Sequence, residues 1–264
     1  MTESAISASG TQEPVRLKGW WKLDEASGTE AADSSGEGHP LRLTGAPSWT
    51  DGATFGGAVA LDGASQWLTS DAPIVESDKS FSVAAWLRLD SSALGGELAL
   101  QPGWFAVTAV SQDGPSHSPF YLGARLINQA AADEEPSFQL HWNMTAAPVD
   151  GSETGPVEWV HAHGQQPIAP SELDTWVFVV GVYDLEAGEV RIYIPGNKDA
   201  GTAALFENWP AWRAEGGLAL GQARFRDEVA DQWPGSVGQV RLYSGVLTET
   251  DAASLFTSDK ISQS

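Results

Sequence analysis

The stretch Trp176-Val177-Phe178-Val179-Val180-Gly181-Val182-Tyr183 is apolar at every position. A short run that is rich in valine and aromatic residues is typical of a strand buried on both faces. Residues 184–188, Asp-Leu-Glu-Ala-Gly, and a second strand-like run over residues 189–194 come next. A glycine-containing loop between two such runs indicates an antiparallel hairpin. The sequence therefore places a central antiparallel strand at residues 176–183.

Three further runs, residues 16–23, 81–90 and 138–145, largely alternate two kinds of side chain. Period-two alternation is typical of antiparallel strands with one face in the core and one in solvent. In the third run, the inward residues are Phe138, Leu140, Trp142 and Met144, and the outward ones are Gln139, His141, Asn143 and Thr145. Turn clusters separate these runs at fairly even spacing, which favours a two-sheet β-sandwich over β-α-β units.

One helix is expected, at residues 248–256, where Thr248 can cap the first turn and Asp251 can complete a capping box. Polar composition predicts a flexible lead-in at residues 1–14 and a polar tail at residues 258–264. One all-β domain over residues 15–257 lies between them. Residues 1–14 contain neither the basic nor the apolar segment of an export signal.

The formal net charge is −21, and only 14 residues are Lys or Arg. Nucleic-acid binding needs cations that displace counterions from phosphates, so we do not expect a nucleic-acid partner. No apolar run approaches the roughly 18 residues of a membrane helix, so membrane insertion is not expected either. Because cysteine is absent, disulfides, thiolate nucleophiles and cysteine-based zinc sites are excluded.

Seven motifs follow one another along the chain. They are Trp21–Asp24, Ala32–His39, Phe55–Gly63, Phe81–Trp86, Trp176–Asp184, Arg191–Gly196 and Trp233–Tyr243. In this order and spacing, from about Lys18 to Phe256, the chain strongly resembles LamG-like jellyroll domains of the concanavalin A-like lectin/glucanase group. The resemblance implies a jellyroll of two curved antiparallel sheets and a module of a secreted or surface protein that binds glycans or proteins. It also implies a structural Ca²⁺.

The acidic, glycine-rich loop at residues 33–39 is the candidate calcium site. Asp33 can offer a carboxylate, and Gly36 a backbone carbonyl, as oxygen ligands. The acidic partner that the family usually has near its last strand is missing, because Gly238 is followed by Gln239. Asp62 or Asp231 could replace it. We favour the alternative, in which Asp33 is an Asx-type turn residue.

Catalysis is not expected, although the same fold hosts glucanases. Those enzymes place two carboxylates about 5 Å apart on one strand, whereas the acidic pairs here, such as Asp133 with Glu135, fall in loop-like segments. A Gly-x-Ser-x-Gly nucleophile motif is also absent.

Recognition of a sugar needs aromatic faces for stacking and polar side chains for hydroxyl groups. The segment 98–172 is rich in both types: Trp104, Tyr121, Asn128, His141, Asn143, Trp159, His161 and His163. His141 and Asn143 share the outward face of one predicted strand. The next strand-like run offers Trp159, His161 and His163 on a shared face, and these five residues form the predicted ligand site.

His161 and His163 could instead bind a transition metal, since alternate positions share a strand face. No third ligand is apparent, so we favour a solvent-facing or hydrogen-bonded pair. The sequence therefore predicts a non-catalytic module that most simply recognises carbohydrate. The alternative is a protein-binding adhesion or spacer module.

Overall fold

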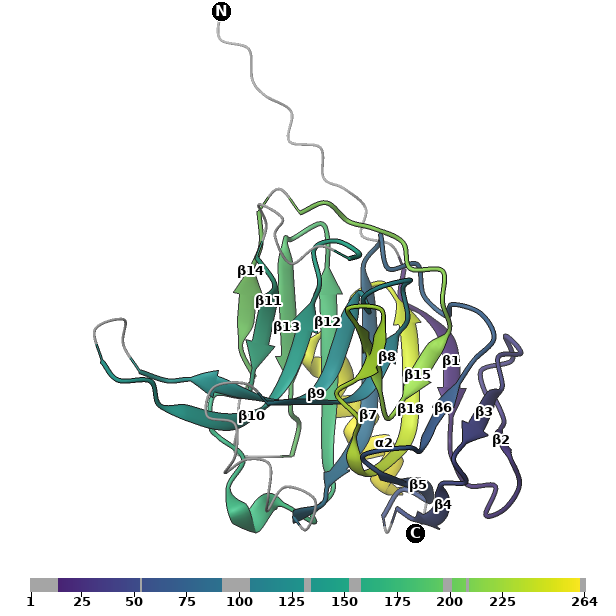
Figure 1. The fold of residues 1–264 in the computed structure, drawn as a ribbon. Helices are drawn as coiled ribbons and strands as arrows, with labels where there is room; N and C mark the ends of the chain where they lie inside the picture. The colour runs from purple at the N-terminus through teal and green to yellow at the C-terminus, as the bar shows by residue number, and fades with distance from the viewer. Residues whose placement is uncertain are drawn as a thin grey trace, which may run out of the picture.

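The computed structural model describes residues 14–52, 54–91, 105–130, 134–151, 158–196, 201–207 and 209–261. Its strands form two large antiparallel sheets, as expected for an all-β jellyroll sandwich (Figure 1). The first sheet runs in the order β14 (Ala203–Leu205), β13 (Glu189–Tyr193), β12 (Val177–Asp184), β7 (Phe81–Leu89), β18 (Pro234–Ser244), β5 (Gly57–Asp62) and β4 (Ser48–Asp51), and β1 (Arg16–Trp21) also pairs with β18. The second runs in the order β11 (Val160–His163), β10 (Phe138–Ala146), β9 (Phe120–Asn128), β8 (Ala106–Gln112), β15 (Leu218–Leu220), β6 (Trp67–Thr69), β3 (Leu41–Thr44) and β2 (Glu30–Ala31).

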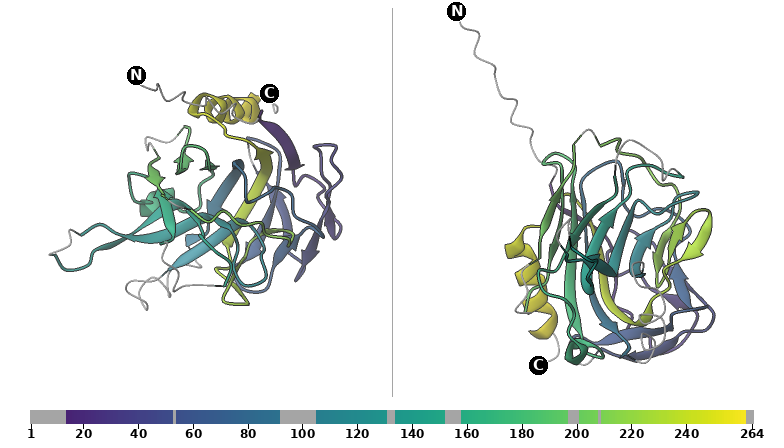
Figure 2. Two further views of the ribbon diagram at one scale, coloured as in Figure 1. Left: turned by 90° about the horizontal axis from the view of Figure 1, so that it is seen from above. Right: turned by 60° about the vertical axis from the view of Figure 1, so that its left-hand side comes forward.

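Two smaller elements cover the outer faces of the sandwich. The helix α2 (Glu249–Ile261) lies against the first sheet, and a separate hairpin of β16 (Ala223–Phe225) and β17 (Glu228–Ala230) lies by the second. The two views in Figure 2 place the helix and this hairpin on opposite sides of the molecule. A single 3-10 turn, η1 (Pro170–Glu172), precedes β12 among the described residues.

The hydrophobic core lies between the two large sheets. Its largest fully buried side chains are those of Trp21, Trp142 and Trp233. The central-strand prediction for residues 176–183 is confirmed, because every residue of β12 is buried. This strand pairs with β13 through the predicted hairpin and with β7 on its other side.

The prediction that residues 81–90 form a half-buried strand is wrong for most of β7. Its first seven residues are all buried, because α2 covers the face that was expected to meet solvent. Trp86 stacks against Phe55 and Phe256 with ring centroids 4.7 and 5.5 Å apart. A second aromatic layer therefore lies beneath the helix.

The predicted capping box of the helix is present, since Thr248 and Asp251 exchange hydrogen bonds. The helix extends past its predicted end at residue 256, because residues 257–261 continue it. Asp259 is buried there and accepts hydrogen bonds from Arg241 on β18 and from Trp86 Nε1. The ion pair with Arg241 compensates the burial of the Asp259 carboxylate. Residues 1–13 of the predicted lead-in lie outside the described residues.

Candidate functional site

Alternation along β10 and β11 sorts their side chains between the core and the outer face of the second sheet. Trp142 and Met144 enter the core, as do Val160 and Ala162 of β11. The intervening side chains therefore project outward, as the sequence predicted. In the antiparallel register, Asn143 lies opposite His163 and Thr145 opposite His161, so the two predicted polar faces adjoin.

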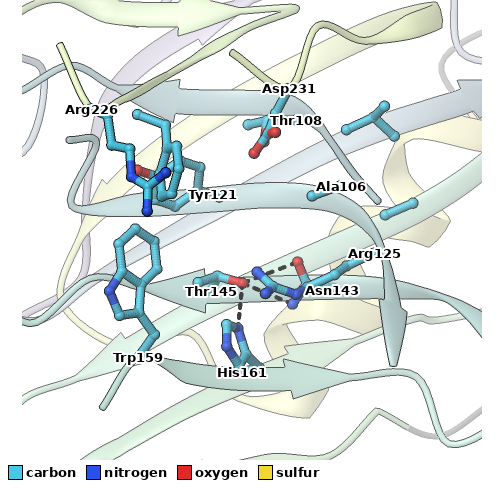
Figure 3. Close-up of a pocket in the computed structure, with 13 residues that line it drawn as sticks. Ala106, Thr108, Tyr121, Arg125, Asn143, Thr145, Trp159, His161, Arg226 and Asp231 are labelled. Atoms are coloured by element: carbon cyan, nitrogen blue, oxygen red, sulfur yellow. Dashed lines mark hydrogen bonds between the residues drawn. The ribbon is translucent and has the colours of Figure 1, made fainter. Parts of the chain in front are cut away.

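These outer faces form part of a cavity of about 560 Å³. Its base comes from β8, β9, β10 and β11, and one wall comes from the β16–β17 hairpin (Figure 3). The lining residues are Ala106, Val107, Thr108, Tyr121, Ala124, Arg125, Asn143, Thr145, Trp159, His161, Phe225, Arg226 and Asp231. Of the five predicted ligand residues, Asn143, Trp159 and His161 line this cavity.

Aromatic rings form one side of the cavity. Trp159 is half-buried, and its ring centroid lies 5.4 Å from that of Tyr121 and 5.9 Å from that of Phe225. The Tyr121 hydroxyl is fixed because it donates to the carbonyl of Arg224 at 2.7 Å. Burial raises the pKa of Tyr121 far above its ordinary value, so the phenol stays neutral. The tyrosine thereby ties the hairpin wall to β9.

A chain of hydrogen bonds orders the polar side of the cavity. Asn143 Nδ2 donates to Thr145 Oγ1 at 3.0 Å, and Thr145 Oγ1 lies 2.8 Å from Nδ1 of His161 (Figure 3). Burial lowers the pKa of His161 to about 3, with smaller effects from the charge of Arg125 and from His163. The imidazole is therefore neutral at physiological pH. The Thr145 hydroxyl is also within 3.2 Å of Asn143 Oδ1, to which it can donate.

His141 and His163 lie beside the cavity but do not line it. His141 is 0 % exposed, so its prediction as a solvent-facing ligand residue is wrong. Both histidines place Nδ1 2.8 Å from the carbonyl oxygen of Gly164, and their rings meet edge to face at 5.2 Å. Because a carbonyl only accepts, each Nδ1 carries a proton. The favoured reading of His163 as hydrogen-bonded is confirmed.

Three charged residues that line the cavity were not among the five ligand residues predicted from the sequence. Arg125 lies on the outer face of β9, Arg226 in the turn of the hairpin, and Asp231 just after it. Burial raises the pKa of Asp231 to about 6, although the charge of Arg125 opposes the rise. The alternation of Tyr121, Gly123 and Arg125 along residues 120–128 was a usable signal for the first arginine. The other two depend on the hairpin, whose position no local pattern reveals.

The predicted calcium residues serve as turn residues. The Asp33 carboxylate accepts hydrogen bonds from four backbone N–H groups and one hydroxyl. Burial by itself raises the pKa of Asp33, but these bonds outweigh it and lower the pKa. Asp62 likewise accepts three backbone N–H groups and a hydroxyl, and Gly36 has a positive φ of 90°.

The five donors around Asp33 occupy its lone pairs, which favours a turn residue over a Ca²⁺ ligand at this position. Among the described residues, no group of three or more His, Cys, Asp or Glu side chains could hold a metal. Trp104 and Asp133 lie outside the described residues. Within the part of the chain that is described, no helix is long and apolar enough to cross a membrane.

Comparisons with known proteins agree with this architecture. The structure resembles domain 4 of AbnA, a GH43 extracellular arabinanase from Geobacillus stearothermophilus, in complex with arabinotriose, with a TM-score of 0.52, 19% identity, and coverage of 92% of this chain and 99% of that one. It also resembles the botulinum neurotoxin serotype C1 binding domain, with a TM-score of 0.59 and 14% identity over 92% of this chain and 52% of that one. The chain thus spans about half of the toxin domain. At these identities the likeness shows the fold.

A search among curated proteins finds no match. The family model of the concanavalin A-like lectin/glucanases superfamily matches residues 61–253, which is most of the chain. This chain therefore belongs to the concanavalin A-like lectin/glucanases superfamily.

Proposed function

We propose that this chain is a non-catalytic carbohydrate-recognition module, and that the cavity on the outer face of the second sheet is its binding site. One observation carries the proposal. The Trp159 and Tyr121 rings line the same cavity as three hydrogen-bonded polar side chains, those of Asn143, Thr145 and His161. Ring faces suit the apolar faces of a sugar, and fixed polar groups suit its hydroxyls.

Two further observations support the proposal. The similar arabinanase domain is described in complex with arabinotriose, so this fold can present a sugar site. Among the described residues that line the cavity, Asp231 is the only carboxylate, whereas hydrolysis of a glycosidic bond ordinarily uses a pair. The arabinanase is extracellular, and we propose a secreted or cell-surface location for this module too.

The test is a glycan array probed with the purified chain, followed by titration calorimetry on the glycans that bind. Trp159→Ala should weaken binding by at least about tenfold, which is about 1.4 kcal/mol. The matched control is Trp67→Ala. Trp67 is also half-buried and lies on β6 of the same sheet, away from the cavity lining, so its loss should leave affinity unchanged.

Thermal melting of both variants checks that each is folded. If no glycan binds, or if Trp159→Ala remains folded and binds as tightly as the unmodified chain, the proposal is refuted.

A further inference from the structure

Asp231 presents its carboxylate to the cavity. It is the only acid among the described residues of the lining, and Figure 3 shows its oxygens on the side that faces Asn143 and Thr145. Asp33 and Asp62 differ, because each accepts four or more hydrogen bonds from neighbouring groups. Within the described part of the chain, no group donates a hydrogen bond to the Asp231 carboxylate. Its two oxygens are therefore available to a ligand.

The backbone holds Asp231 in a fixed position at the edge of the cavity. Its carbonyl oxygen accepts a hydrogen bond from the N–H group of Thr108 on β8 at 2.7 Å. Two residues later, Trp233 is fully buried in the core, and its N–H group donates to the carbonyl of Gly221 at 3.0 Å. An acceptor that is already in position loses little freedom when a ligand binds.

The fold keeps this carboxylate although its burial is unfavourable. Burial raises the pKa of Asp231 to about 6, and the charge of Arg125 only partly offsets the rise. A buried acid with a shifted pKa inside a cavity is a candidate for function. The other titratable or charged groups of the lining are Tyr121, His161, Arg125 and Arg226. The first two are neutral and the arginines stay charged from pH 5 to 7.5, so Asp231 is the group of the described lining whose charge changes in this range.

We propose that Asp231 binds a pair of neighbouring hydroxyl groups on a neutral sugar, one at each carboxylate oxygen, while Trp159 packs against the sugar ring. This inference rests on the carbohydrate-binding function proposed above. An ionised carboxylate only accepts hydrogen bonds, so its partner has to supply O–H donors, which a sugar carries on adjacent carbons. Hydroxyls form bonds with a charged acceptor that are about twice as strong as neutral ones. A negative charge on the ligand would repel the carboxylate, which favours a neutral sugar.

The test is calorimetry at pH 7.5 with neutral trisaccharides: arabinotriose, xylotriose, cellotriose, galactotriose and maltotriose. A glycan that binds on the array but is not among them is added to the series. Asp231→Asn should weaken binding at least about tenfold, because an amide replaces the charged acceptor. Asp24→Asn is the matched control. Asp24 is exposed and lies outside the cavity lining, so its replacement should leave affinity unchanged. Thermal melting checks that both variants are folded.

The pH dependence of binding separates a role in ligand binding from a structural one, and the unmodified chain alone suffices to measure it. The ionised form predominates above the pKa of Asp231, so affinity should be full at pH 7.5 and fall as the pH drops through about 6. At pH 5 about a tenth of the carboxylates are ionised, so binding should be about tenfold weaker. Binding at pH 6 should also release protons, which calorimetry in two buffers of different ionisation enthalpy measures. Asp231→Asn should show neither effect.

Monodeoxy analogues of the trisaccharide that binds show whether two hydroxyls take part. Removal of either of two adjacent hydroxyls should cost at least about fivefold in affinity with the unmodified chain and little with Asp231→Asn. A loss at one position only, or at none, overturns the hydroxyl pair.

The outcomes separate the two proposals. A folded Asp231→Asn variant that binds as tightly as the unmodified chain, or an affinity that does not fall at pH 5, overturns the role of Asp231 and leaves carbohydrate recognition standing. An array that yields only acidic glycans overturns the neutral ligand. Binding of no sugar at all overturns both proposals.

Discussion

Replacing Asp231 with asparagine removes a carboxylate that the fold holds in unfavourable surroundings. Burial raises the pKa of Asp231 from 3.8 to about 6, against the opposing charge of Arg125. The Asp231 carboxyl group therefore binds its proton more tightly in the folded chain than in the unfolded chain. Loss of that proton destabilises the fold. Asparagine has the same shape and tolerates the positive φ of 52° found at this position. We expect Asp231→Asn to stabilise the protein at neutral pH.

The magnitude follows from the size of the pKa change. Each pKa unit is worth about 1.4 kcal/mol, so full ionisation costs at most about 3 kcal/mol at pH 7.5. The cost is fully present above the folded pKa and disappears below the unfolded one. At pH 4.5 it should have fallen to about 1 kcal/mol. The advantage of the variant should therefore shrink by up to about 2 kcal/mol between these two pH values.

Urea unfolding followed by tryptophan fluorescence at both pH values measures this difference. Asp24→Asn is the control, because Asp24 is exposed in the loop after β1, and its replacement should change stability little at either pH. A variant that is less stable than the unmodified protein at pH 7.5 would refute the reasoning. So would a gain that is equally large at pH 4.5.

Three other outcomes are expected. Trp142→Ala should lower the free energy of unfolding by about 3–5 kcal/mol in urea titrations, because it empties a fully packed core position; a loss below about 1 kcal/mol would contradict that placement. Asp259→Ala should cost about 3 kcal/mol in the same assay because it leaves its buried arginine partner uncompensated, and an unchanged stability would show that the end of α2 is not docked. Chelator should leave the melting temperature unchanged if Asp33 is only a turn residue, whereas a fall reversed by Ca²⁺ and absent in Asp33→Ala would restore the calcium prediction.

Period-two alternation predicted side-chain orientation correctly for strands that have one face in the core. It placed Trp142 inside and placed Asn143 and His161 on the outer faces of their strands. That these two faces adjoin is shown by the pairing of β10 with β11. Alternation could not say what lies on those outer faces. His141 is buried because its neighbours, including Gln129 and His163, close over it.

The same limit explains the errors on the first sheet. Ala84 and Trp86 follow the expected period, yet they pack beneath α2 instead of meeting solvent. Ser82 is buried as well, and it hydrogen-bonds to Gly245 and Leu247 just before the helix. The packing of the helix depends on long-range contacts such as that of Asp259 with Arg241, which no local pattern contains. The charged part of the cavity was missed for a similar reason, since more than a hundred residues separate Tyr121 from its partner Arg224.

The β16–β17 hairpin pairs with neither large sheet, so one wall of the cavity is built apart from the strand pairing that defines the sandwich. Of its turn residues, Asp227 accepts a hydrogen bond from the Ser116 hydroxyl, whereas Arg226 is exposed and lies outside the hydrophobic core. Phe225 and Arg226 nevertheless form part of the cavity wall. If the cavity binds sugar as proposed, substitutions at Arg226 would alter its wall while the two large sheets beneath it stay the same.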